Sequence, residues 1–288
     1  MKVIGLDAGH GLKTAGKRTP TGIHEWELND KVRDKVVSLL KGYDVKFVFT
    51  DEDEGNVDET LASRVKKYIN AGVDVFVSLH HNALSGVFGN WGGVEVYVDK
   101  SPTSKDNALA NAIYKRLPSY TGLKGRGIKK ENWYVINQNK VPAVLIEGGF
   151  MDSNNDYKVI TSDKGQEAYA KAVAEGLIEF LGLKKTTTQS TTTNTAVTTT
   201  LKTGNYKTLY NMKVRSGVWG SVKKVSQLTA DGKRNATSTN PNASAVYKKG
   251  TIFTAKKIIN HTDGSVWAQS PSGYICIKEK NQTYCQKV

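Results

Sequence analysis

Residues 73–82 read Val-Asp-Val-Phe-Val-Ser-Leu-His-His-Asn, a run of β-branched and apolar residues that ends in two histidines and an asparagine. An apolar run of this length is typical of a strand that is buried on both faces, as strands are in a parallel sheet. Residues 2–7 form a similar run, which leads into Asp-Ala-Gly-His-Gly. Two buried strands that each lead to a histidine predict a parallel sheet with imidazole side chains at one edge.

Segments with a helical spacing of apolar residues separate the expected strands. A helix is expected within residues 25–43, where the apolar positions are Leu28, Val32, Val36, Leu39 and Leu40. Three more stripes begin at Leu61, Leu109 and Ala172, and Gly182 ends the last of them. Further strands are expected at residues 45–49, 93–98, 133–136 and 143–146. The alternation predicts an α/β fold whose largely parallel sheet is covered by helices on both faces.

The net charge of the chain lies entirely in its last third. Residues 1–182 hold 24 Lys and Arg against 24 Asp and Glu, whereas residues 183–288 hold 17 against 3, which gives the whole formal excess of +14. Residues 184–203 contain eleven threonines and almost nothing apolar, a composition typical of a low-complexity linker. We therefore predict a first domain at 1–182, a Thr-rich linker at 183–204 and a basic second domain at 205–288.

The sequence pattern of the second domain is typical of a small β-protein. Short apolar pieces are separated by Gly, Asn, Ser and Asp, and they lie at residues 212–214, 222–225, 252–253, 266–268 and 274–277. Short strands with such turn signals predict an all-β barrel or sandwich. The polar stretch 229–244 is expected to be an inserted or elongated loop.

The two cysteines, Cys276 and Cys285, are too few for a disulfide framework, and their spacing is not that of a metal-binding pair. We interpret them as small buried or half-buried residues, with a single bridge formed after release of the protein as the alternative.

Hydropathy excludes a membrane-spanning helix, because no apolar run approaches the roughly 20 residues that a span needs. The apolar stretch at residues 2–7 is also shorter than the core of a signal peptide, which is about 7–15 residues long. We expect a mature chain that begins at or near Met1, is not exported by the usual secretion pathway and does not insert into membranes.

Two histidines and two acids stand at the ends of the expected elements: His10, Glu25, His80 and Glu147. Sites in such sheets gather at the carboxyl ends of the strands, so these four side chains are expected at one edge. Two imidazoles and one carboxylate, with a fourth position left open, are a ligand set of catalytic zinc, which activates water. A second carboxylate can carry the water's proton to a leaving amine. The set predicts a metal-dependent amide hydrolase.

The sequence around these residues sharpens that prediction. Four ordered strings are Ala-Gly-His-Gly at 8–11, the run at 22–29 with its Glu25 and Asn29, Ser-Leu-His-His-Asn-Ala at 78–83 and Leu-Ile-Glu-Gly-Gly-Phe at 145–150. Together with Arg64 and Asn70 they resemble the zinc-dependent N-acetylmuramoyl-L-alanine amidase family of bacterial autolysins and phage endolysins. The resemblance covers the first domain.

The resemblance implies a twisted, largely parallel six-stranded sheet flanked by helices. It makes His10, Glu25 and His80 the zinc ligands and Glu147 the catalytic acid/base. It also implies hydrolysis of the amide between N-acetylmuramic acid and the first L-alanine of the stem peptide in bacterial peptidoglycan.

Three polar residues near these strings need separate interpretation. His81 departs from the family, which often has a small residue there; since side chains alternate along a strand, it should face away from His80. His24 and Arg126 are interpreted as exposed polar residues, with a contact to the substrate as the alternative.

The second domain resembles bacterial SH3-like cell-wall-binding domains in two strings, Asn-Met-Lys-Val-Arg-Ser-Gly at 211–217 and Trp-Ala-Gln-Ser-Pro-Ser-Gly-Tyr-Ile at 267–275. This resemblance implies binding to wall peptide or to an associated anionic polymer such as teichoic acid. Aromatic residues that fit either a binding groove or the core are Tyr210, Trp219, Tyr247, Trp267 and Tyr274.

Taken together, these features predict a modular zinc enzyme that degrades peptidoglycan. We expect a phage endolysin that stays in the host cytoplasm until lysis releases it to the wall. One alternative is a bacterial autolysin of the same chemistry, such as one that lyses a mother cell. An alternative from another class is a second domain that binds nucleic acid, but its basic residues form scattered pairs without a nucleic-acid motif, so no such partner is expected.

Overall fold

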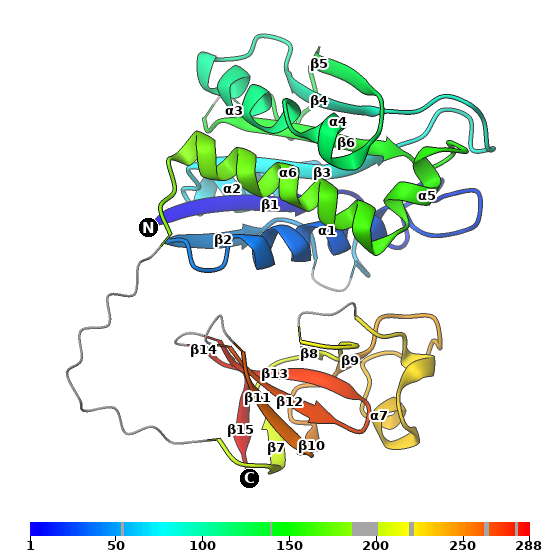
Figure 1. Cartoon of the computed structure of the whole chain (residues 1–288), viewed down its shortest axis with the longest axis vertical. Helices are drawn as coiled ribbons and strands as arrows, with labels where there is room; N and C mark the ends of the chain where they lie inside the picture. Colours follow the sequence, from blue (N-terminus) through cyan, green and yellow to red (C-terminus); the bar gives the residue numbers. More distant parts are fainter. Residues whose placement is uncertain (53–54, 139, 186–200, 219–221, 262–264, 280–281) are drawn as a thin grey trace. The chain divides into compact units, whose positions relative to one another are not determined.

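The computed structural model of the chain describes residues 1–52, 55–138, 140–185, 201–218, 222–261, 265–279 and 282–288. The chain divides into two compact units, Met1–Thr187 and Thr188–Val288 (Figure 1). Most of the expected linker, at 186–200, lies outside the described residues. Each unit has its own hydrophobic core.

The first unit alternates strands and helices. Its strands are β1 (Lys2–Ala8), β2 (Val45–Phe49), β3 (Val75–Asn82), β4 (Val94–Asp99), β5 (Gly125–Glu131) and β6 (Ala143–Phe150). Its helices are α1 (Glu25–Leu39), α2 (Leu61–Asn70), α3 (Ser104–Tyr114), α4 (Leu117–Thr121), α5 (Asp156–Ile160) and α6 (Asp163–Leu181). No helix in the described part of the chain combines the length and apolar character that a bilayer crossing needs.

The six strands form one sheet in the order β2-β1-β3-β6-β4-β5. Neighbouring strands run parallel except β4 and β6, which are antiparallel. The predicted six-stranded, mostly parallel sheet is therefore confirmed. The last strand of the first unit, β6, lies inside the sheet between β3 and β4, so the carboxyl ends of β1, β3 and β6 meet at one edge.

Helices cover both faces of the sheet. Val75, Val77 and Leu79 of β3 are buried in one core with residues of α1, α3 and α6. Phe76, on the opposite face, packs in a second core with residues of α2. Figure 1 shows α1 and α6 along the first of these faces. This two-sided burial explains why the central strands β1, β3 and β6 are apolar at most positions before their carboxyl ends.

One predicted strand of the first unit is wrong. Residues 133–136 form a turn, in which the backbone N–H groups of Ile136 and Asn137 both donate to the Trp133 carbonyl oxygen at 3.0 Å. Val135 and Ile136 are buried in the core with α2, so their apolar character reflects a loop packed on the sheet. The strand that the pattern misses is β5, an edge strand rich in Lys and Arg.

Local chemistry fixes the helix ends. The Thr60 hydroxyl accepts a hydrogen bond from the Ser63 N–H at 3.1 Å and starts α2. Helix α6 ends beside Gly182, as predicted. Helix α1 ends at Leu39 rather than near residue 43, because Gly42 takes a left-handed conformation (φ 86°) and turns the chain toward β2.

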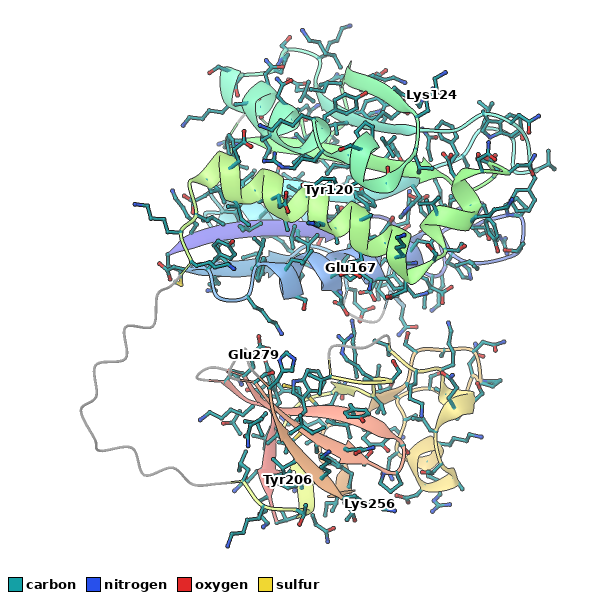
Figure 2. The ribbon with its side chains drawn as sticks, in the orientation of Figure 1. Tyr120, Lys124, Glu167, Tyr206, Lys256 and Glu279 are labelled. Atoms are coloured by element: carbon teal, nitrogen blue, oxygen red, sulfur yellow. The ribbon has the colours of Figure 1, made fainter. Side chains whose placement is uncertain are left out.

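The second unit consists mainly of short strands. They are β7 (Gly204–Thr208), β8 (Met212–Lys213), β9 (Val246–Tyr247), β10 (Ile252–Ala255), β11 (Lys257–Asn260), β12 (Val266–Ser270), β13 (Gly273–Glu279), β14 (Gln282–Thr283) and β15 (Cys285–Lys287). They form sheets in the orders β10-β7-β15, β11-β12-β13-β14 and β8-β9, and every pair is antiparallel. Among the described residues, Trp267 and Tyr206 are large, fully buried core residues. Lys256 is exposed, and Figure 2 labels it together with Tyr206.

Two expectations for this unit need correction. The 222–225 piece contains no strand and leads into the 3-10 helix η1 (Val225–Gln227), where the Gln227 N–H donates to the Lys224 carbonyl. The expected loop at 229–244 carries the short helix α7 (Ala230–Arg234), which begins at Thr229 because its hydroxyl accepts the Gly232 N–H.

The aromatic and cysteine residues of the second unit separate by burial. Tyr247 and Trp267 belong to the core, Tyr274 is packed partly against it, and Tyr210 is half exposed at 50%. Trp219 lies outside the described residues. Both cysteines are buried as free thiols, which confirms their interpretation as buried residues.

Candidate metal centre and active site

The first candidate ligand, His10, lies directly after β1 in a constrained turn. It is the one non-glycine residue in the described part of the chain with positive φ, at 66°. The buried Arg64 guanidinium fixes this turn, because it donates to the carbonyl oxygens of Ala8 at 3.1 Å and His10 at 2.7 Å. A side chain at Gly9 would collide with the His80 ring, since a Cβ there would stand 2.1 Å from it. The turn therefore brings the two histidines together.

The second candidate ligand, Glu25, is the first residue of α1 and is buried. Its Oε1 lies 3.0 Å from His80 Nδ1, and its Oε2 lies 3.3 Å from His10 Nε2. Burial alone would raise the pKa of Glu25, but the hydrogen bond and charge of His80, with the nearby His10 and Lys17, lower it to about 2. Glu25 is thus an ionised carboxylate between two imidazoles.

The third candidate ligand, His80, lies near the end of β3. Burial alone would lower its pKa, but the hydrogen bond with Glu25 outweighs this and raises it. The rings of His80 and His10 meet edge to face, with centroids 4.9 Å apart. Burial lowers the pKa of His10 to about 4, so its ring is neutral at neutral pH and offers a lone pair.

These three side chains form a group that fits a metal ion. One nitrogen of His10, one oxygen of Glu25 and one nitrogen of His80 all lie within 4.8 Å of one another. Ligands held about 2.0–2.2 Å from zinc stand roughly 3.3 Å apart in a tetrahedron. Glu25 Oε2 makes no hydrogen bond to any residue that the structure describes, so a buried charged atom is left for a cation.

The fourth expected residue, Glu147, lies on β6 beside this group. It is the register partner of His80 across the parallel β3–β6 pair, and it is buried. Its Oε2 has no hydrogen-bond partner within the described ranges. Burial raises the pKa of Glu147 to about 8, against the lowering effect of His80. The structure thus brings all four expected site residues to one sheet edge.

His81 faces away from this group, as the alternation along β3 predicts. Its ring is buried against Tyr169 of α6, with centroids 5.6 Å apart, and its Nδ1 lies 2.7 Å from the Asn29 side-chain oxygen. Burial lowers the pKa of His81 to about 4. The Asn29 amide in turn donates to the Gly9 carbonyl at 3.2 Å. His81 and Asn29 therefore support the turn before His10 from the α1 side.

His24, interpreted as an exposed residue, is instead half-buried at the start of α1. Its backbone N–H donates to the Glu27 carboxylate at 3.2 Å, and its side chain is outside the group of potential metal ligands.

A buried acid that the sequence patterns did not single out lies next to Glu147. Glu95 on β4 is the register partner of Glu147 across the antiparallel β4–β6 pair. Its carboxylate accepts hydrogen bonds from four side chains: Asn82 at 2.8 Å, Tyr97 at 2.9 Å, Arg126 at 2.8 Å and Lys129. These bonds outweigh burial and lower the pKa of Glu95. The sequence does contain a signal for this residue, namely a Glu within the apolar run 94–98. An acid in a fully buried strand needs polar partners, so its position predicts a buried ion pair or hydrogen-bond network.

The first unit is similar in sequence and fold to N-acetylmuramoyl-L-alanine amidases. A family model described as N-acetylmuramoyl-L-alanine amidase matches residues 4–179. The endolysin of Bacillus phage SPP1 is 35% identical over 187 residues, which cover 64% of this chain and 68% of that protein. The N-acetylmuramoyl-L-alanine amidase LytC of Bacillus subtilis is 28% identical, over 62% of this chain and 35% of LytC. The catalytic domain of the amidase CwlV from Bacillus (Paenibacillus) polymyxa var. colistinus superposes with a TM-score of 0.59 at 32% identity, over 64% of this chain and all of that domain.

Proposed function

This chain belongs to the N-acetylmuramoyl-L-alanine amidase family, and we propose that it is a zinc-dependent peptidoglycan hydrolase that cleaves the amide between N-acetylmuramic acid and L-alanine. The observation that carries the proposal is the meeting of His10, Glu25 and His80 beside Glu147. Three potential ligands and a separate buried carboxylate are the parts that metal-assisted amide hydrolysis needs.

In this proposal His10, Glu25 and His80 hold the metal. Two imidazole nitrogens and a carboxylate oxygen match the ligand preference of zinc, and a bound zinc ion supplies Lewis acidity for attack on an amide. Arg64 and Asn29 hold the turn that carries His10, through the carbonyls of His10 and Gly9. Since zinc ligands are oriented by such contacts, these two residues fix the geometry of the site.

Glu147 moves the proton. A carboxyl with a pKa of about 8 exchanges its proton near neutral pH, the range in which a general acid/base is effective. We infer that Glu147 takes a proton from the attacking water and returns it to the amine of L-alanine as the amide bond breaks. Its place in register with His80 puts it beside the ligand group.

For the biological role we propose a phage endolysin whose second unit binds the bacterial wall, with release from the host cytoplasm at lysis. The similarity to the protein of phage SPP1 that is named an endolysin supports the endolysin role. The surplus of 17 Lys and Arg over 3 Asp and Glu at 183–288 supports attraction to an anionic wall polymer. A bacterial autolysin of the same chemistry is the alternative, which the relation to LytC supports.

Digestion of purified Gram-positive walls tests the reaction. We expect new amino groups of L-alanine without new reducing sugars. New reducing ends without free L-alanine amino groups would instead identify a glycosidase and overturn the proposed bond.

Metal removal tests the cofactor. Chelation should abolish hydrolysis, and zinc should restore it. His80→Ala should lose both bound zinc and activity, whereas His24→Ala, which changes a nearby histidine outside the ligand group, should keep both. Full turnover by metal-free protein contradicts the zinc proposal.

A further inference from the structure

Four charged or polar side chains stand in a row across four neighbouring strands at the carboxyl edge of β3 and β6. His80 of β3 is in register with Glu147 of β6, and Glu147 is in register with Glu95 of β4. The irregular part of the β4–β5 pairing, between Val94 and Val96, brings Arg126 of β5 to Glu95, with its Nε 2.8 Å from the carboxylate. The row thus leads from the candidate metal centre to a cation on the edge strand.

At the end of this row away from the candidate metal centre, the positive charge exceeds the negative charge of Glu95. Glu95 contributes one negative charge, and Arg126 and Lys129 both form ion pairs with it. Two neutral donors, Asn82 and Tyr97, already bind the same carboxylate. One counterion and these donors would satisfy Glu95 in the sheet. The second cation is therefore a net positive charge at this point.

This charge is open to solvent and held in a fixed orientation. The Arg126 and Lys129 side chains are 33% and 37% exposed, whereas the Glu95 side chain is 1% exposed. The Arg126 guanidinium lies over the Phe150 ring, 5.0 Å from its centroid. Its Nε faces Glu95, its Nη1 has only a long contact of 3.5 Å with the Gly92 carbonyl, and its Nη2 donates to no residue in the described ranges. The outer side of the guanidinium can therefore take an anion.

We propose that Arg126, assisted by Lys129, binds a carboxylate of the stem peptide and so determines specificity for acidic peptides. This inference rests on the proposed function. Neighbouring strands lie about 4.8 Å apart, so Arg126, two strands from Glu147, stands roughly 10 Å from it. An extended peptide spans about 3.3–3.6 Å per residue, which places the bound carboxylate about three residues from the scissile amide. Arg pairs with carboxylates through two parallel hydrogen bonds, which gives selectivity as well as affinity.

A pair of substrates tests this assignment: a soluble muramyl-peptide with free peptide carboxylates and the same compound with each carboxylate converted to a primary amide. The wild-type full-length protein should hydrolyse the acidic substrate with a kcat/KM about 10- to 100-fold higher, the usual range for a hydrogen-bonded charge pair. Arg126→Gln should remove most of this preference, by lowering kcat/KM on the acidic substrate and changing it less than about threefold on the amide. Arg126→Lys should keep part of the preference.

Lys130→Gln is the matched control, because Lys130 is exposed and follows Lys129 on β5, so its side chain lies on the opposite side of the strand from that of Lys129. It should leave both rates unchanged. If Arg126→Gln lowers both rates equally, Arg126 acts only by holding Glu95, and the carboxylate assignment is wrong. Equal wild-type rates on the two substrates also overturn it, whether or not any variant folds. Failure of the wild type to release L-alanine amino groups from either substrate overturns the proposed function itself, and this inference with it.

Discussion

The two units of the chain differ in how they arrange their functional side chains. In the first unit, parallel strands bring His10, Glu25, His80 and Glu147 to one edge although they are up to 137 positions apart in the sequence. The second unit pairs its strands only in antiparallel fashion, and within its described residues no group of three potential metal ligands occurs. In a parallel sheet, side chains from distant parts of the sequence meet at the carboxyl edge. In a sheet of short antiparallel strands, polar side chains are instead spread over the solvent-facing surface.

The same contrast appears in the charges. The first unit has as many acids as bases up to residue 182, and several of its acids are buried with partners, including Asp7, Glu25 and Glu95. Nearly all charged residues of the second unit are basic, and they lie mostly on its surface. Charges that are buried and paired build a site, whereas unbalanced surface charge attracts a polyanion.

The change with the largest expected effect is Glu147→Gln. It removes the proton carrier but leaves the ligand group, so hydrolysis should fall by about 10²- to 10⁴-fold with zinc still bound. Turnover can be measured on a soluble muramyl-peptide, and zinc by elemental analysis. Sedimentation with purified walls should be unchanged, since we assign wall binding to the other unit. Substantial remaining hydrolysis removes Glu147 from the mechanism.

The converse change, Trp267→Ala, should break the second unit alone. Trp267 is 1% exposed and is among the largest buried side chains, so the cavity should cost about 3–5 kcal/mol. Scanning calorimetry of the full chain should lose or shift one transition, while turnover of the soluble substrate persists. A parallel loss of hydrolysis would show that the two units depend on each other for folding.

Lowering the pH should destabilise the first unit more than the second, with a smaller effect than the Trp267→Ala substitution. Arg64 and the Ser78 and Thr50 hydroxyls outweigh burial and lower the pKa of Asp7, and the pKa of Glu95 is also lowered. Carboxyls with a depressed folded-state pKa stabilise the fold fully above their unfolded pKa of about 4, and this contribution is lost as pH falls through the folded value. The raised pKa of Glu147 changes stability only above its unfolded pKa of about 4, so calorimetry between pH 4 and pH 2 should show the first unit's transition falling further than the second's. Equal shifts contradict the contrast in buried charge.

The smallest expected effect compares two equivalent helix caps. The Thr60 and Thr229 hydroxyls each accept a backbone N–H at 3.1 Å, at the starts of α2 and α7. Thr60→Ala and Thr229→Ala should each cost about 1 kcal/mol, in the first and second unit respectively. The Thr229 hydroxyl also bonds the Ser272 hydroxyl at 2.8 Å, so its removal should cost the more. Each variant should shift only its own unit's transition.

The sequence predicts most of the first unit because its buried strands contain apolar runs. Strands β1, β2, β3, β4 and β6 and the main helices follow from such runs and from helical spacing. Strand β5 does not, since it is rich in glycine and basic residues, whereas β2 at the other edge of the sheet is apolar at four of its five positions. The turn at 133–136 fails for the opposite reason, because a loop buried on the sheet is as apolar as a strand.

The candidate site could be predicted only as a set of residues. His10, Glu25, His80 and Glu147 stand out as polar groups at element ends, and the fold does bring them together. The contact of Arg126 with Glu95 beside Glu147 could not be predicted, because it depends on β6 lying between β3 and β4 and on the antiparallel β4–β6 pairing. A contact of Arg126 with the substrate was only the alternative interpretation of that residue. No local pattern encodes the order of strands in a sheet.

The strand order of the sheet also has a consequence for the chain during its synthesis. During synthesis His10, Glu25 and His80 emerge from the ribosome long before Glu147, and β4 is made before the strand that must sit between it and β3. The final position of β6 between β3 and β4 can therefore be filled only after residue 150 has been added. Under the proposed function, a nascent or truncated chain can therefore carry every proposed metal ligand and still lack Glu147, so it should not hydrolyse the amide until β6 has been made.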